Sequence, residues 1–174
     1  MRDSFNKKEI KLIDNIIIHS SDSPWGTARE IKLWHTDLPP RGRGWSDIGY
    51  HFIILNGKPV DSSFYLEPLD GSIECGRRLD GDMDIEPDEV GIHTLGYNKS
   101  SIGICMIGMK LDRITFTIRQ FDALKGLLIA LCQHYKIDSN KVLGHCETIS
   151  GKKQGKTCPE FDVAPFRTWL KGRV

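Results

Sequence analysis

Two histidines and a cysteine are the residues of this chain best suited to bind a metal ion. His19 and His145 each follow a short apolar run that predicts a buried strand, and Cys158 lies thirteen residues after His145. Side chains at strand ends can converge on a crevice beside a sheet. Two imidazoles and one thiolate would give zinc three protein ligands and leave a fourth position for water.

The same three residues permit other interpretations. Each histidine or cysteine taken alone could be an ordinary core residue, and the spacing by itself does not decide the matter. Cys158 could also serve as the nucleophile of a Cys–His hydrolase. Pro159 follows it directly and no helix is predicted to begin there, which disfavours a nucleophile.

The elements that must position these residues alternate between strands and helices, which predicts an α/β fold with helices on both faces of a sheet. We expect strands over residues 16–18, 50–55, 101–108 and 142–143, and shorter ones over 58–60 and 72–74. Asn56-Gly57 predicts a tight hairpin turn into residues 58–60. Capping-box sequences at Thr27 and Thr117 predict helices that extend to about residues 37 and 135, and Asp162 is expected to cap a final helix.

Composition bounds the protein to one soluble, folded domain. The chain has 174 residues, of which 39% are hydrophobic and 27% charged, with a net charge of +1. Residues 61–90 hold ten acids against two arginines, a local charge of −8, so the remaining residues carry +9. We therefore expect a single domain over 1–174 with an acidic loop insertion at about 61–90, and no nucleic-acid partner that relies on global positive charge.

The cysteines and the N-terminal residues indicate where the protein is made. The five cysteines show no repeated spacing, and the first residues contain no apolar signal segment. We expect cytoplasmic synthesis with free thiols, no signal peptide and no insertion into a membrane.

Four motifs occur together in an order that is typical of one enzyme family. They are HSSDSP, WSDIGYHFII, GIHTLGYNKSSIGICMIG and GHCE followed by KTCPEFD. This combination resembles the type-2 N-acetylmuramoyl-L-alanine amidases, which include phage amidases, bacterial recycling amidases and animal peptidoglycan recognition proteins. The resemblance covers about residues 14–170 and is closest to the short phage amidases. It implies a central mixed β-sheet flanked by helices, with no separate wall-binding domain.

The resemblance also implies roles for individual residues. It makes His19, His145 and Cys158 the zinc ligands, and it places Tyr50 and Lys156 at the positions of the catalytic tyrosine and lysine. The loop over residues 146–155 is longer than in the close phage relatives. For that reason Lys152 or Lys153 could take the place of Lys156.

The implied substrate is the amide bond between N-acetylmuramic acid and L-alanine in peptidoglycan. Zinc would lower the pKa of a bound water toward about 7 and polarise the carbonyl. Tyr50 and Lys156 could donate to the developing oxyanion, and either of them could accept the proton. His93, Asn98 and Trp45 are expected to line the substrate groove, although His93 and Asn98 could instead anchor a turn.

We expect a monomeric phage endolysin that reaches the cell wall once the membrane has been permeabilised. Two alternatives remain open: a non-catalytic module that binds peptidoglycan, and a cytoplasmic amidase that recycles soluble muropeptides. A polymerase partner is also conceivable, and no sequence motif tests it.

Overall fold

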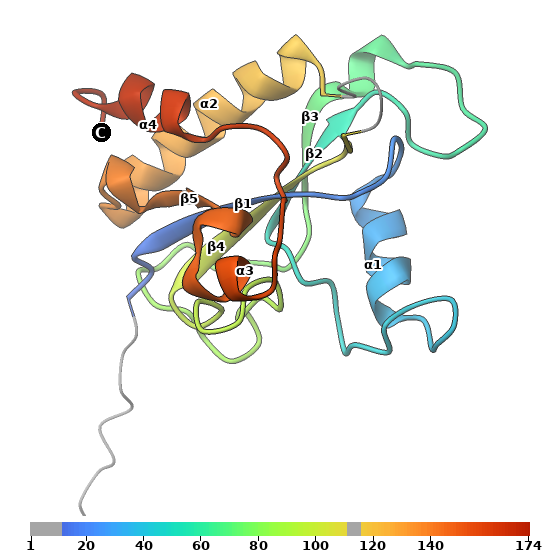
Figure 1. The fold of residues 1–174 in the computed structure, drawn as a ribbon, viewed down its shortest axis with the longest axis horizontal. Helices are drawn as coiled ribbons and strands as arrows, with labels where there is room; N and C mark the ends of the chain where they lie inside the picture. The colour runs from blue at the N-terminus through green and yellow to red at the C-terminus, as the bar shows by residue number, and fades with distance from the viewer. Residues whose placement is uncertain (1–11, 111–115) are drawn as a thin grey trace, which may run out of the picture.

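Five strands form one mixed sheet in the computed structural model, which describes residues 12–110 and 116–174 (Figure 1). In spatial order they are β3 (Asp70–Cys75), β2 (Phe52–Asn56), β4 (Ser101–Met106), β1 (Asn15–Ser20) and β5 (Val142–Gly144). β4 runs parallel to β1 and β2, and β5 runs parallel to β1, whereas β3 is antiparallel to β2. The expected mixed sheet is confirmed.

Helices cover both faces of this sheet. Four α-helices were found in the described residues: α1 (Ala28–Thr36), α2 (Ile118–Tyr135), α3 (Ile149–Lys153) and α4 (Ala164–Leu170). Short 3-10 helices occupy Glu67–Leu69, Ser139–Lys141 and His145–Glu147. In the described part of the chain no helix is both long enough and apolar enough to cross a membrane.

The predicted caps fix the helix starts. The Thr27 hydroxyl accepts a hydrogen bond from the Glu30 N–H, and Thr117 and Gln120 satisfy each other's backbone N–H groups in a full capping box. The last helix differs from the prediction, because its N-cap is Val163 and not Asp162. The Asp162 carboxylate nevertheless accepts a hydrogen bond from the Ala164 N–H.

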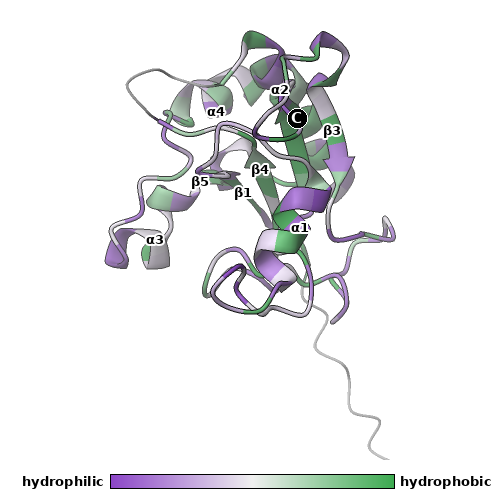
Figure 2. Ribbon diagram, turned by 90° about the vertical axis from the view of Figure 1, so that its right-hand side faces the viewer, coloured by the Kyte–Doolittle hydropathy of each residue, from purple (hydrophilic) through white to green (hydrophobic). Residues whose placement is uncertain are grey.

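Alternation along the strands divides the core into two layers. Ile16 and Ile18 on β1 pack with α2 and α4, where Leu124, Leu128 and Phe166 are buried. The opposite face carries a smaller cluster built around Ile31 of α1. In Figure 2 the strands are largely hydrophobic, whereas α1 alternates between hydrophilic and hydrophobic surfaces. His19 lies one residue after Ile18, so its side chain points to the face that α1 covers.

One predicted strand is wrong. Residues 58–60 form no strand, and β2 pairs with β3 instead. The Asn56 side chain donates to the Pro24 carbonyl and accepts from the Lys58 N–H, while the Lys58 carbonyl accepts from Gly26. These bonds turn the chain toward the start of α1 and away from a hairpin.

The acidic segment over residues 61–90 is not a loop throughout. It contains the edge strand β3, which agrees with the short strand expected over residues 72–74. The 3-10 helix Glu67–Leu69 directly precedes this strand, and the loop after the strand leads to the turn that holds His93.

Candidate active site

The three predicted ligands lie together at one end of the parallel strands. His19 lies near the end of β1, His145 follows β5 directly, and Cys158 lies in the loop between α3 and α4. Their ligand atoms all fall within 4.8 Å of one another. The Cys158 Sγ is 3.7 Å from Nδ1 of His19, whose side chain is 1% exposed.

A chain of hydrogen bonds sets the tautomer of His19. Its Nε2 lies 3.1 Å from Nδ1 of His93, and the His93 Nε2 lies 3.4 Å from the Ser101 hydroxyl. That hydroxyl donates to the Tyr97 carbonyl, so the most consistent direction of donation runs from His19 through His93 to Ser101. This arrangement leaves the lone pair of the His19 Nδ1 facing the thiol, as in a metal ligand supported from its other nitrogen.

Gly103 makes room for this chain. It lies on β4, and a Cβ atom at this position would come within 2.8 Å of the His93 ring. The absence of a side chain at Gly103 therefore allows the His93 ring to approach His19.

Electrostatics favour a metal ligand over a free nucleophile at Cys158. Burial raises the pKa of the thiol to about 11, although the Ser20 N–H donates to the sulfur at 3.2 Å. Burial also lowers the pKa values of His19 and His145, with the charge of Lys156 adding to the effect at His145. Neither imidazole therefore carries the charge that a thiolate–imidazolium pair requires, whereas a bound cation would stabilise the thiolate.

A salt bridge fixes the turn that carries His145. The Glu147 carboxylate accepts from the Gly144 N–H, and Arg167 of α4 donates to both of its oxygens at 2.8 Å. The Cys146 N–H donates to the Cys158 carbonyl at 2.8 Å, which joins the loops of two ligands.

Tyr50 lies beside the ligand cluster. Its ring centroid is 5.0 Å from that of His19. Burial, together with the nearby thiols of Cys105 and Cys158, raises the pKa of Tyr50 well above its ordinary value. The phenol therefore stays protonated at neutral pH and is poorly suited to accept a proton as phenolate.

Lys156 is the lysine that borders the site. It is exposed and lines the same groove as the ligands, while Lys152 and Lys153 are exposed on α3 and are not among the lining residues. Within residues 146–155 the chain forms this short helix, α3.

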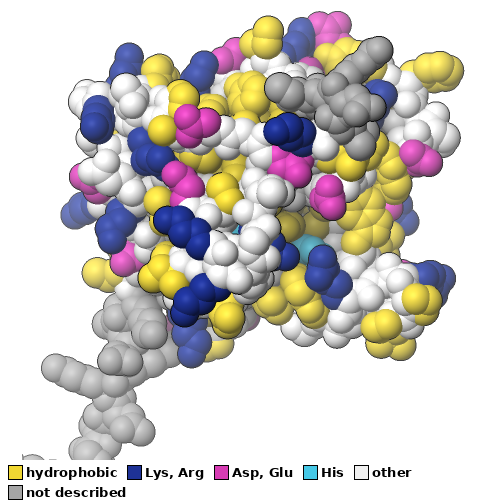
Figure 3. Space-filling model, in the orientation of Figure 1, with side chains coloured by type: hydrophobic (Ala, Val, Ile, Leu, Met, Phe, Trp, Pro, Cys, Tyr) yellow, Lys and Arg dark blue, Asp and Glu magenta, His cyan; other side chains and the backbone are white. Residues whose placement is uncertain are grey.

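The site opens into a groove of about 660 Å³. Figure 3 shows histidine surface at the bottom of a hollow flanked by Lys and Arg side chains. Trp45, His93 and Asn98 all line this groove. The Asn98 side-chain oxygen accepts from the N–H groups of His93 and Thr94, so this residue also anchors the turn.

His35 is a residue of the site that no sequence motif indicates. This residue of α1 is buried, and its Nδ1 accepts from the Gly49 N–H at 3.0 Å. Its ring contacts the rings of Trp45 and Tyr50 in tilted arrangements, with centroids 4.6 and 5.4 Å away. Arg43 lies over Trp45 and completes this wall of the groove. A histidine inside a predicted amphipathic helix gives no local signal of such a position.

His51 is a buried histidine behind the site. Its Nε2 donates to the Glu89 carbonyl and its Nδ1 accepts from the Gly103 N–H, at 2.9 Å in each case. Burial lowers the pKa values of His35 and His51 to about 4, with added effects from the charges of Arg43 and Arg77 respectively.

Acid should destabilise the protein through these two histidines. Because the folded pKa values of His35 and His51 are about 4 against an ordinary 6.5, the unfolded chain binds protons first as the pH falls. Above pH 6.5 these histidines do not lower the free energy of unfolding. As the pH falls from 6.5 toward 4, the free energy of unfolding decreases progressively. At pH 5 the loss is about 2 kcal/mol for each histidine. Urea denaturation of chelator-treated protein above pH 6.5 and at pH 5 measures this loss. An equal free energy of unfolding at the two pH values would contradict the prediction. The variant His51→Gln should lose about 2 kcal/mol less.

Comparison with known proteins agrees with the site. The profile of the N-acetylmuramoyl-L-alanine amidase family matches residues 9–161. The endolysin of Escherichia phage T7 is 31% identical over 174 residues, covering 96% of this chain and 92% of the relative. Peptidoglycan-recognition protein LE of Drosophila melanogaster is 27% identical, covering 81% of this chain and 32% of the relative.

Solved structures share the fold. N-acetylmuramoyl-L-alanine amidase LysC from Clostridium intestinale superposes with a TM-score of 0.65 at 24% identity, covering 92% of this chain and 87% of the other. Drosophila PGRP-LB gives a TM-score of 0.59 at 27% identity, with coverages of 87% and 76%. With the profile matching most of its length, the chain belongs to the N-acetylmuramoyl-L-alanine amidase family.

Proposed function

We propose that this amidase is a zinc-dependent endolysin that cleaves the bond between N-acetylmuramic acid and L-alanine in peptidoglycan. The observation that carries the proposal is the convergence of His19, His145 and Cys158, with ligand atoms within 4.8 Å of one another. Tyr50 and Lys156 line the same groove. The family match and the phage relatives named endolysin support the choice of reaction and of biological role.

The donor set fits zinc. Two imidazoles and a thiolate are ligands that zinc prefers, and three protein ligands leave one position open. The hydrogen bonds from His19 to His93 and from the Ser20 N–H to the sulfur supply the outer support that such ligands need. Bound zinc would supply Lewis-acid chemistry, activating water near neutral pH and polarising the scissile carbonyl.

The protein's own groups would bind the substrate and stabilise developing charge. Tyr50, protonated at neutral pH, donates its O–H toward the carbonyl oxygen that becomes negative. Lys156 brings a positive charge to the same groove. A well-placed donor of this kind contributes about 3 kcal/mol to transition-state stabilisation. Trp45 and His93 form walls against which the sugar or the start of the peptide would pack.

Zinc content tests the ligand set directly. We expect about one zinc ion per chain in purified protein, because three ligands converge on one position. The variant Cys158→Ser should lose the metal on dialysis. Cys146→Ser is the matched control and should retain it, since Cys146 lies outside the ligand cluster. Elemental analysis measures both, and full zinc in the Cys158 variant would exclude this thiol as a ligand.

The reaction products test the proposed activity. Digestion of purified peptidoglycan should release peptides with new L-alanine amino termini and no new reducing sugars. New reducing ends would instead identify a glycosidase, and binding without release would favour a recognition module. Activity on intact sacculi is expected for an endolysin, whereas activity confined to soluble muropeptides would favour a recycling enzyme.

A comparison of lysine variants tests the role of Lys156. The variant Lys156→Ala should lower kcat by about 100-fold, as expected when an oxyanion donor is lost. Lys152→Ala should retain normal kcat, because that side chain is exposed on α3 and away from the groove lining. A lowered kcat in Lys152→Ala together with a normal kcat in Lys156→Ala would assign the role to Lys152 and refute the proposal for Lys156.

A further inference from the structure

We propose that Arg77 is a positioning residue for Tyr50, an inference that rests on the role of Tyr50 in the proposed function. Arg77 is separated from Tyr50 by the whole of β2 and β3, yet it holds the main chain on both sides of it. Its backbone N–H donates to the Tyr50 carbonyl at 2.8 Å, and its Nε donates to the Ile48 carbonyl at 3.2 Å.

The main chain over residues 48–50 is held at every carbonyl. Arg77 binds the carbonyls of Ile48 and Tyr50, and the Ile92 N–H donates to the intervening Gly49 carbonyl at 3.0 Å. Gly49 also packs closely, since a Cβ atom there would lie 2.3 Å from the Ile92 carbonyl oxygen. Two of these three hydrogen bonds are donated by Arg77, one from its side chain and one from its backbone.

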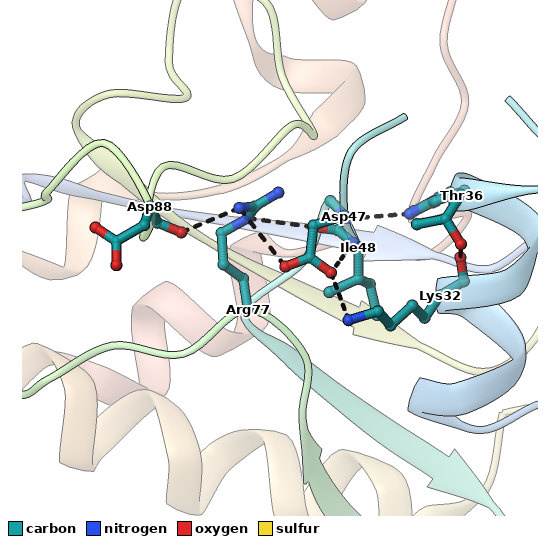
Figure 4. Close-up of polar contacts among 8 residues, drawn as sticks. Lys32, Thr36, Asp47, Ile48, Arg77 and Asp88 are labelled. Carbon is teal, nitrogen blue, oxygen red and sulfur yellow. Dashed lines mark hydrogen bonds and ion pairs between the residues drawn. The ribbon is translucent and has the colours of Figure 1, made fainter. Parts of the chain in front are cut away.

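The guanidinium is itself fixed by groups from several elements (Figure 4). One terminal nitrogen donates to the Asp88 carbonyl at 3.0 Å and lies 3.8 Å from the Asp47 carboxylate. Asp47 also pairs with Lys32 of α1 at 2.8 Å and accepts from the Ile48 N–H. Partial burial raises the pKa of Asp47, but these hydrogen bonds and the two cations lower it overall, so the carboxylate stays charged.

Only arginine has the donors for this arrangement. Its planar group can serve the Ile48 and Asp88 carbonyls at once while facing a carboxylate, whereas a lysine ammonium is a single compact charge. The Arg77 side chain is only 9% exposed and does not line the groove at the ligand cluster. It therefore acts on the reaction through Tyr50 and not by contact with substrate.

Kinetics of Arg77 variants test this inference. We expect Arg77→Met to lower kcat at least tenfold with KM changed less than twofold, because small displacements of a catalytic group slow chemistry more than binding. Zinc content should stay at the wild-type value, since Arg77 touches no ligand. Arg78→Met, the exposed neighbour, is the matched control and should keep normal kcat. Hydrolysis of a soluble muropeptide, normalised to folded protein, gives both constants.

A double-variant cycle separates positioning from general stability. In the Tyr50→Phe background, Arg77→Met should cause little further fall in kcat. An equal fall in both backgrounds, or full kcat in Arg77→Met, would overturn the inference and leave the proposed function intact. Full activity in Tyr50→Phe would overturn the role of Tyr50 and this inference with it.

Arg77→Lys keeps the test decisive if the methionine variant does not fold. It retains the charge and the backbone N–H, and we expect kcat to fall at least threefold because one ammonium cannot serve both carbonyls. Normal kcat in a folded Arg77→Lys variant would contradict the assignment.

Discussion

The hydrogen bond between His19 and His93 is the constraint around which the site is built. His19 is almost fully buried near the end of a central strand, so its imidazole has to be neutral and both of its nitrogens need partners. The bond to His93 satisfies one nitrogen and leaves the other for a ligand. It also requires a residue without a side chain at Gly103 and a turn that brings His93 over β4. The Asn98 side chain stabilises that turn by accepting a hydrogen bond from the His93 N–H. His19 on the sheet, Gly103 and the turn at His93 therefore together determine which nitrogen of His19 carries the proton.

The sheet separates stability from chemistry. On one face, isoleucines of β1 and β4 pack against α2 and α4 and form the larger hydrophobic cluster. On the other face the same strands present His19 and Gly103, and buried polar groups replace part of the apolar core. Such groups cost free energy unless each is hydrogen-bonded, and in the described residues every buried side-chain polar atom has a partner. The apolar face can thus compensate for a polar face that serves the reaction.

Local signals in the sequence predicted what depends on local chemistry. The caps at Thr27 and Thr117 start their helices where expected, because a cap involves only neighbouring residues. The His19, His145 and Cys158 set came from residue types and from the family resemblance, and the structure brings the three together. The hairpin predicted at Asn56-Gly57 does not form, because the Asn56 side chain donates to the Pro24 carbonyl, a partner distant in sequence. The positions of His35 and Arg77 were missed for the same reason, since the ring contact of His35 with Tyr50 and the hydrogen bond of Arg77 to Ile48 are tertiary contacts without a motif.

The two halves of the site have separate supports. The loops of His145 and Cys158 are joined to each other and tied to α4 through Arg167 and Glu147. The main chain at Tyr50 is held instead by Arg77, whose guanidinium donates to the Asp88 carbonyl farther along the acidic segment. Because few groups are shared, a change in one support can move the candidate metal ligands without moving the phenol, or the reverse. The acidic segment then has a structural reason within the enzyme: its backbone carbonyls, more than its carboxylates, close around the arginine and the histidine behind the site.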